Sequence, residues 1–148
     1  MKLLVAVDGS EQSDRAIEYA TNIANATGGS ITLVHAVEPD VYDTGGDEPS
    51  SMSERRDRLI IDSLDAAEKH GRTVLDEATE YASELGRDAD SDLLYGDPVR
   101  VITDYAEAKG IDTIYVGHRG LSGSAARVLG SVARGVVERA TVPVTVIQ

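Results

Sequence analysis

The sequence predicts one α/β domain, spanning residues 1–148, on a doubly wound, five-stranded parallel sheet with strand order 3-2-1-4-5 and helices on both faces. Five short apolar runs rich in β-branched residues alternate with segments of helical periodicity. Turns rich in Gly, Pro and Asp separate them. A chain of 148 residues is long enough to bury about 70% of its extended surface around a single core.

The first two strands are expected to form a β-α-β unit. Residues 2–7 (KLLVAV) are a nearly continuous apolar run, as in a strand buried on both faces. The run breaks at Asp8, and Ser10 can cap the following helix. The pair Gly28-Gly29 is expected to end that helix, and residues 30–37 (SITLVHAV) read as the second strand.

Residues 38–56 are rich in Pro, Gly, Asp and Ser without apolar periodicity, and we expect a loop there. The loop is either a mobile surface insertion or a lid, since it follows a strand end on the expected ligand side. Ser51 and Glu54 have the spacing of a capping box and are expected to start the next helix. From about residue 53 to residue 85 the pattern fits one long helix or two stacked helices, with Gly71 as the candidate kink.

The second half of the chain continues the alternation of strands and helices. Its expected elements are a strand at 90–95, a helix at 98–109, a strand at 111–117, a helix at 131–140 and a strand at 143–147. In the order 3-2-1-4-5 the first and fourth strands are neighbours at a topological switch point. This arrangement is expected to bring Asp8 opposite Gly117.

Between the fourth strand and the following helix lies a glycine-rich stretch, VGHRGLSGSAARVLGSV, at residues 116–132. Its glycines at 117, 120 and 130, followed by Ser131, have the spacing G-x2-G-x9-G-S. A strand that leads through glycines into a helix N-terminus is a common phosphate site, because glycines allow close approach and unpaired N–H groups face the anion. Neither G-x4-G-K-[ST] nor G-x-G-x-x-G is present. A nucleotide is the expected ligand.

The local charge around the glycine-rich stretch supports its interpretation as a phosphate site. Between residues 117 and 139 there are four arginines and one acid, a local charge of +3 in a chain of net charge −12. Those residues are Arg119, Arg127, Arg134, Arg139 and Glu138. We expect Arg119 and then Arg127 to meet a phosphate, whereas others can decorate the surface or pair with acids elsewhere.

Composition excludes several classes of function. The net charge of −12 argues against a general electrostatic surface for nucleic acid or anionic lipid, and the absence of Phe and Trp removes the usual stacking platforms. Without cysteine there is neither a disulfide nor a thiolate metal site. No signal-peptide pattern or apolar run of roughly 20 residues occurs, so we expect a cytoplasmic protein without membrane insertion.

The balance among charged residues suggests adaptation to high salt. Arg outnumbers Lys 11 to 3, and there are 15 Asp. An ordinary acidic cytosolic protein is the alternative.

The glycine stretch resembles the ATP-binding signature of the universal stress protein family. VAVDGS, VHAV, GDP and VPVTVI also stand where that family has comparable motifs, so the resemblance covers nearly the whole chain and is weakest at 38–56. It implies an adenine nucleotide alpha-hydrolase-like fold. It also implies an ATP-binding protein of stress response or signalling, acting as a nucleotide-dependent switch or chaperone-like regulator with at most slow ATP hydrolysis.

The resemblance also implies particular contacts. Asp8 would lie against the nucleoside, with a turn or helix-cap carboxylate as the alternative, and the main chain of Ala36 would meet the adenine edge. Ser131 can cap a helix and, together with the N–H group of Val132, can also bind phosphate oxygens. The expected ATP-binding set is Ala6, Val7, Asp8, Ala36, Val116, Gly117, His118, Arg119, Gly120, Leu121, Ser122, Gly123, Arg127, Gly130, Ser131, Val132 and Ala133. Any Mg²⁺ would be carried by the phosphates, because the loop has no carboxylate.

No catalytic or metal-binding residue is expected. The histidines at 35, 70 and 118 have no local acid and nucleophile arrangement, His70 is expected on a helix surface, and zinc motifs and G-x-S-x-G are absent. His118 stands where the family usually has Ser, and either contacts phosphate or faces solvent. One alternative function is a dimeric interaction scaffold of the same fold that binds no nucleotide. Another is an adenylating or flavin-dependent enzyme, which the lack of an S-G-G-x-D-S loop and of a second domain disfavours.

A homodimer through the C-terminal strand is expected. Residues 142–147 (VPVTVI) form a β-branched run at a sheet edge, and exposed apolar edges tend to pair. A second copy would give a two-fold contact, and family members often dimerise here too. The alternative is an edge covered by the protein's own helices.

Overall fold

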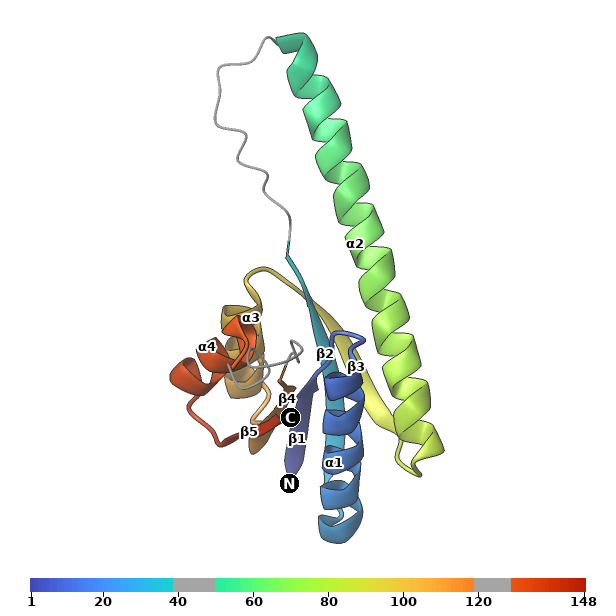
Figure 1. Ribbon diagram of the computed structural model, residues 1–148, viewed down its shortest axis with the longest axis vertical. Helices are drawn as coiled ribbons and strands as arrows, with labels where there is room; N and C mark the ends of the chain where they lie inside the picture. The colour runs from blue at the N-terminus through green and yellow to red at the C-terminus, as the bar shows by residue number, and fades with distance from the viewer. Residues whose placement is uncertain (39–49, 119–128) are drawn as a thin grey trace.

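The computed structural model describes residues 1–38, 50–118 and 129–148, with the side chains of the second helix described from residue 63. Helices and strands alternate along the chain (Figure 1). The elements are β1 (Lys2–Ala6), α1 (Glu11–Thr27), β2 (Ser30–Val37), α2 (Ser50–Glu84), β3 (Ala89–Tyr95), α3 (Pro98–Ala108), β4 (Thr113–Gly117), α4 (Ser131–Arg139) and β5 (Val144–Ile147). The strands agree with the predicted ranges to within two residues.

The five strands form one parallel sheet in the order β3-β2-β1-β4-β5, which confirms the predicted topology. At the carboxyl end of β1, Ala6 pairs with Val34 of β2 on one side and with Val116 of β4 on the other. The chain after β1 therefore emerges between the ends of two neighbouring strands. This is the switch point at which open α/β sheets bind ligands.

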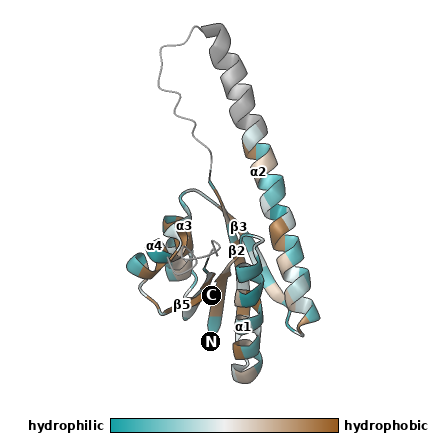
Figure 2. Ribbon diagram, viewed as in Figure 1, coloured by the Kyte–Doolittle hydropathy of each residue, from teal (hydrophilic) through white to brown (hydrophobic). Residues whose placement is uncertain are grey.

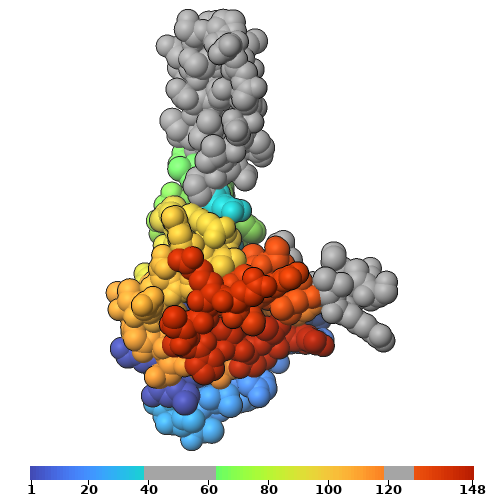
Figure 3. Space-filling view, turned by 90° about the vertical axis from the view of Figure 1, so that its left-hand side faces the viewer, coloured from blue at the N-terminus to red at the C-terminus, as the bar shows by residue number. Residues whose placement is uncertain are grey.

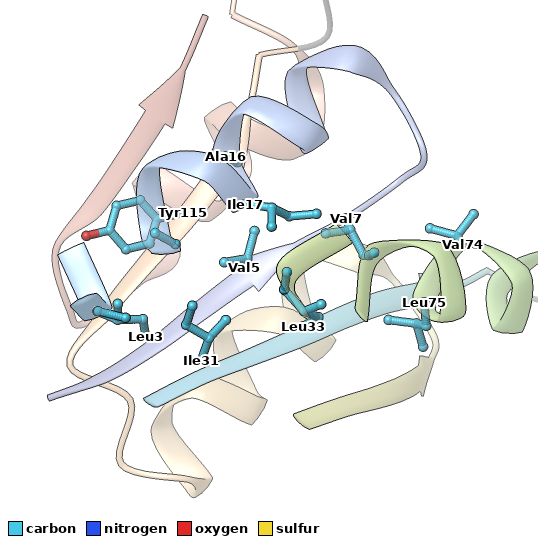
Figure 4. Close-up of a cluster of buried hydrophobic side chains, with 14 residues drawn as sticks. Leu3, Val5, Val7, Ala16, Ile17, Ile31, Leu33, Val74, Leu75 and Tyr115 are labelled. Carbon is cyan, nitrogen blue, oxygen red and sulfur yellow. The ribbon is translucent and has the colours of Figure 1, made fainter. Parts of the chain in front are cut away.

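Two cores lie on opposite faces of the sheet, because successive strand side chains alternate between the faces. On one face Leu3, Val5 and Leu33 pack against Ile17 of α1 and Leu75 of α2 (Figure 4). The other core, under α3 and α4, is formed by Leu4, Val34, Ile102, Ala106, Ile111, Ile114, Val116, Ala133 and Val136. Both hydrophilic and hydrophobic residues occur along the helices, as expected for helices buried on one side (Figure 2).

Both ends of α1 form as the sequence predicts. The Ser13 N–H donates to Ser10 Oγ at 3.2 Å at the start of α1, and Gly28 ends the helix in the left-handed region with φ 72°. At the start of α3 the Arg100 N–H donates to Asp97 Oδ2 at 3.1 Å. The interpretation of Ser131 as a helix cap is wrong, because Gly130 occupies the cap position and Ser131 is the first residue of α4.

The second helix is longer than predicted. α2 begins at Ser50, so residues 50–56 of the expected loop are helical and Ser51 lies inside the helix instead of capping it. Residues 39–49 of that loop lie outside the described part of the chain. The helix is continuous through Gly71 and extends well beyond the sheet (Figure 1).

Position 71 needs a glycine because the helix packs closely there, and not because the helix kinks. A Cβ atom at this position would lie 2.7 Å from Leu93 Cδ1 and 2.9 Å from His35 Cδ2. The absence of a side chain thus lets α2 rest directly on β2 and β3. Within the described ranges no helix has an apolar stretch long enough to span a bilayer.

Candidate functional site

A cleft of about 280 Å³ opens at the carboxyl edge of the sheet. It is bounded by the ends of β1, β2 and β4 and by the N-terminal parts of α3 and α4. Ten of the predicted site residues line it: Ala6, Val7, Asp8, Ala36, Val116, Gly117, Gly130, Ser131, Val132 and Ala133. The structure thus brings together the two ends of the predicted site, which are more than 100 residues apart in the chain.

A second hollow of about 330 Å³ lies between α1 and α2. Four carboxylate residues line it, namely Asp14, Glu77, Glu80 and Glu84. Such a lining repels phosphate, because like charges in a concave surface reinforce one another. We therefore regard the cleft at the sheet edge as the candidate site for an anionic ligand.

The floor of the cleft is apolar. Val34, Ile102 and Val116 are 0%, 3% and 3% exposed and belong to the core beneath α3 and α4. The small side chains of Ala6 and Ala36 leave space above them. An apolar floor with a few polar groups at its rim suits a flat, partly apolar ligand.

The N-terminus of α4 forms one wall of the cleft. Its cap residue Gly130 has no side-chain hydrogen bond to the helix, and the first turn contains no acidic residue. Ser131, Val132 and Ala133 of that first turn line the cleft. Backbone N–H groups in the first turn of a helix have no partner within the helix and carry partial positive charge. This wall therefore favours an anionic group such as phosphate.

Asp8 is part of a turn at the rim of the cleft. Its Oδ1 accepts from the Ser10 N–H at 2.9 Å, and its own N–H donates to Ser13 Oγ at 3.2 Å. The turn role considered from the sequence is thus present. The exposed side chain also lines the cleft, so the turn places a carboxylate at its edge.

Gly117 has a packing role beside its place in the cleft. A Cβ atom there would lie 2.8 Å from the Gln12 carbonyl carbon and 2.9 Å from the Ser13 nitrogen. The end of β4 therefore touches the backbone of α1. From the sequence, only the approach of a phosphate was expected at this glycine.

His118 is buried and only 3% exposed, so the alternative in which it faces solvent is wrong. Its N–H donates to the Ile147 carbonyl at 2.6 Å, which continues the β4–β5 ladder. Among the described residues its Nε2 atom has no hydrogen-bond partner. It does not line the described cleft.

The predicted arginines fall into two groups. Arg134 pairs with Glu138 at 3.1 Å within α4, and Arg139 donates to Thr103 Oγ1 at 3.0 Å and pairs with Asp104 at 3.4 Å. The predicted residues Arg119, Gly120, Leu121, Ser122, Gly123 and Arg127 lie outside the described part of the chain.

Five lining residues were not predicted from the sequence: Val34, His35, Glu38, Pro98 and Ile102. His35 lies near the carboxyl end of β2 and Glu38 directly follows it, so the strand-end rule applied to Asp8 could have found these two, whereas Val34 lies within the strand. Pro98 and Ile102 lie on α3, and no local motif marks them. Over the described ranges there is no group of three His, Cys, Asp or Glu residues that could hold a metal ion.

Comparison with known proteins establishes the family. The model of the universal stress protein family matches residues 1–148. The chain belongs to the universal stress protein family. The resemblance noted in the sequence is thus confirmed.

Among relatives of this universal stress protein, "Universal stress protein YxiE" of Bacillus subtilis (strain 168) is 31% identical, over 99% of this chain and 98% of the relative. The solved structure of universal stress protein UspA from Lactobacillus plantarum is 28% identical with a TM-score of 0.81, covering 100% of this chain and 97% of that one. A universal stress protein solved in complex with cAMP is 26% identical with a TM-score of 0.67, covering 100% and 96% of the two chains.

Proposed function

We propose that this universal stress protein binds an adenine nucleotide, ATP in the first place, in the cleft at the sheet edge. Bound nucleotide would act as a switch in stress response or signalling, with at most slow hydrolysis. The observation that carries the proposal is the combination in one cleft of an apolar floor, the carboxylate of Asp8 and the first turn of α4.

Each part of the nucleotide has a matching surface. The base fits the apolar floor near Ala36, and the ribose hydroxyls can donate to the carboxylate of Asp8. The phosphates would lie at the N-terminus of α4, close to the hydroxyl of Ser131. Arg119 and Arg127 would add positive charge, and any Mg²⁺ would be held mainly by the phosphates.

The cAMP bound by a relative of 26% identity supports an adenine nucleotide as the ligand class.

Mass spectrometry of the small molecules released from the purified, heat-denatured protein tests the proposal. We expect an adenine nucleotide, and calorimetric titration of the stripped protein should then rank ATP against ADP, cAMP and GTP. If no nucleotide is released and none binds at millimolar concentration, the interaction scaffold becomes the better explanation. Pyrophosphate release that depends on an added substrate would instead indicate an adenylating enzyme.

We also propose that two copies join through β5. The opposite edge strand β3 carries Asp90 and Asp92, whose charges discourage pairing, whereas β5 has no charged residue. Figure 3 shows that α4 and β5 form one continuous face, and Val137 on α4 is 46% exposed. An uncharged edge beside exposed apolar side chains suits a second copy of the same surface.

A further inference from the structure

The last backbone pairing between β1 and β2 is unusual on the side of the cleft. The paired register ends at Ala6 and Val34, and the Val7 N–H adds one more bond, to the Val34 carbonyl at 2.8 Å. In a parallel ladder the next bond would run from the Ala36 N–H to the Val7 carbonyl. Between these two described residues that backbone bond is not made.

The imidazole of His35 makes a hydrogen bond to the Val7 carbonyl instead. His35 Nδ1 lies 2.7 Å from the Val7 oxygen. Because a carbonyl oxygen can only accept, the proton of this bond is on Nδ1. The Val7 carbonyl thus accepts from a side chain of β2 at the point where the ladder would otherwise continue through the Ala36 N–H.

The backbone of Ala36 is directed toward the cleft by the alternation of the strand. The Val34 carbonyl accepts from Val7 in β1, whereas the Val37 carbonyl accepts from Gly96 beyond β3 at 2.9 Å. Since N–H and C=O groups alternate in direction along a strand, those of Ala36 point to the side of β1. There β1 has already ended, and Ala36 lines the cleft.

The ring of His35 is held from behind by α2. The helix approaches so closely that a Cβ atom on Gly71 would lie 2.9 Å from His35 Cδ2. The His70 ring stands edge-on to the His35 ring, with 6.2 Å between their centroids. This support restricts the rotamers of His35 and keeps Nδ1 directed at Val7.

We propose that His35 is a positioning residue that ends the β1–β2 ladder by binding the Val7 carbonyl, and so leaves the Ala36 backbone to the base of the bound nucleotide. An N–H and a C=O on one strand edge complement adenine, whose ring nitrogen accepts beside an amino group that donates. Guanine presents the reverse order on the same edge, so the arrangement selects adenine. The inference rests on the proposed function for its ligand, but its structural part can be tested without one.

Amide hydrogen exchange measured by NMR on the nucleotide-free protein tests the structural part. We expect the Ala36 amide to exchange at least about tenfold faster than that of Val34 in the centre of the sheet. In His35→Leu the Val7 carbonyl is released, the ladder gains a bond, and exchange at Ala36 should slow. An Ala36 amide that is as protected as Val34 in the wild-type protein would overturn the inference, whether or not the variant folds.

Nucleotide titration of a matched pair of variants tests the functional part. His35→Leu removes the donor, whereas His35→Asn keeps an N–H at the position of Nδ1. We expect the Leu variant to lose about 3- to 10-fold in ATP affinity, as for one lost hydrogen bond, and to lose most of its preference for ATP over GTP. The Asn variant should retain both the ATP affinity and the preference for ATP over GTP.

A general loss of stability in His35→Leu would weaken the binding of ATP and of GTP alike. An unchanged ratio of the two affinities would therefore count against the positioning role. A wild-type protein that binds no nucleotide would overturn the proposed function, whereas the exchange result at Ala36 would still decide the role of His35 in the ladder. The two failures are therefore distinguishable.

Discussion

Gly117 at the end of β4 lies directly against the backbone of Gln12 in α1, with room for a hydrogen atom but not for a methyl group. An added Cβ atom would lie 2.8 Å from the Gln12 carbonyl carbon. Since backbone on both sides must move to admit it, we expect Gly117→Ala to lower the free energy of unfolding by about 1–3 kcal/mol. Urea denaturation measures this loss.

The control for Gly117→Ala is Gly110→Asn. Gly110 has φ 64°, and nothing lies within 4 Å of an added Cβ atom there. Asn tolerates the left-handed region, so this variant should stay close to the wild-type stability. Equal stability of Gly117→Ala and the wild-type protein would contradict the packing role.

Gly130→Val tests whether the phosphates bind at the N-terminus of α4. Gly130 has φ −61° and ψ 155°, values that any residue adopts, so valine strains the backbone little. Its branched side chain would crowd the first N–H groups of α4. We expect a loss of at least about tenfold in ATP affinity, or about 1.4 kcal/mol, with the melting temperature nearly unchanged.

Glu107→Val, on the exposed part of α3 away from the cleft, is the matched control and should bind ATP normally. If Gly130→Val is well folded and binds ATP with wild-type affinity, the phosphates do not lie at the N-terminus of α4.

The stability of the protein is expected to depend on pH through the carboxyl group of Asp14. Burial first, and then the carboxylates of Glu18, Glu77, Asp8 and Glu11, raise its pKa above the ordinary 3.8. A carboxyl whose pKa is higher in the folded state costs stability as it ionises, so this cost appears as the pH rises above about 3.8. We expect Asp14→Asn to be more stable than the wild-type protein at pH 7, by less than about 1 kcal/mol because the side chain is exposed.

The difference between Asp14→Asn and the wild-type protein should vanish in acid below the unfolded-state pKa. Thermal denaturation at several pH values measures it. A variant that is less stable at neutral pH would show that the carboxylate of Asp14 makes a net favourable contribution.

Salt should stabilise the protein. Its net charge is −12, and the carboxylates around Asp14 already repel one another. Raising the ionic strength from about 0.01 M to 1 M shortens the Debye length from about 30 Å to 3 Å and screens this repulsion. We expect the melting temperature to rise with KCl, and to rise less in Asp14→Asn. A flat or falling curve would speak against adaptation to high salt.

The proposed dimer can be tested by removing a single backbone donor at the outer edge of β5. The carbonyls of Pro143 and Ile147 accept from Ile114 of β4 and from His118 just beyond it, so by alternation the N–H of Val146 points away from the sheet. Proline is tolerated at such an edge position. We expect Val146→Pro to leave the β4–β5 bonds in place and to shift the protein from dimer to monomer in light scattering.

Val146→Ala is the control for the lost side chain, because Val146 also packs against the core under α4. It should remain dimeric. A wild-type protein that is monomeric at micromolar concentration would exclude the dimer altogether.

Local patterns were enough to predict most of the fold. The strands are short β-branched runs, and Ser10 and Gly28 are residues whose own chemistry starts and ends a helix. The beginning of α2 could not be found in this way. Residues 50–56 (SSMSERR) have no apolar periodicity, so nothing in them distinguishes an exposed helix from a loop.

The site was predicted in part. Asp8 and Ala36 follow from the strand-end rule and the family resemblance, and both line the cleft. The bond from His35 to Val7 joins residues 28 positions apart, and the contact of Gly71 with Leu93 depends on how a helix rests on two strands. Such tertiary contacts leave no local signal. A glycine in a helical pattern suggests a kink as readily as close packing.

The close packing of α2 on the sheet at Gly71 has a mechanical consequence. From Gly71 to its start at Ser50 the helix runs for roughly 30 Å, at about 1.5 Å per residue, and reaches beyond the sheet (Figure 1). A tilt of about 5° at Gly71 displaces Ser50 by roughly 3 Å for a helix of that length. Any small rearrangement beneath Gly71, where α2 lies close to the ring of His35, would therefore be magnified at the far end of the helix.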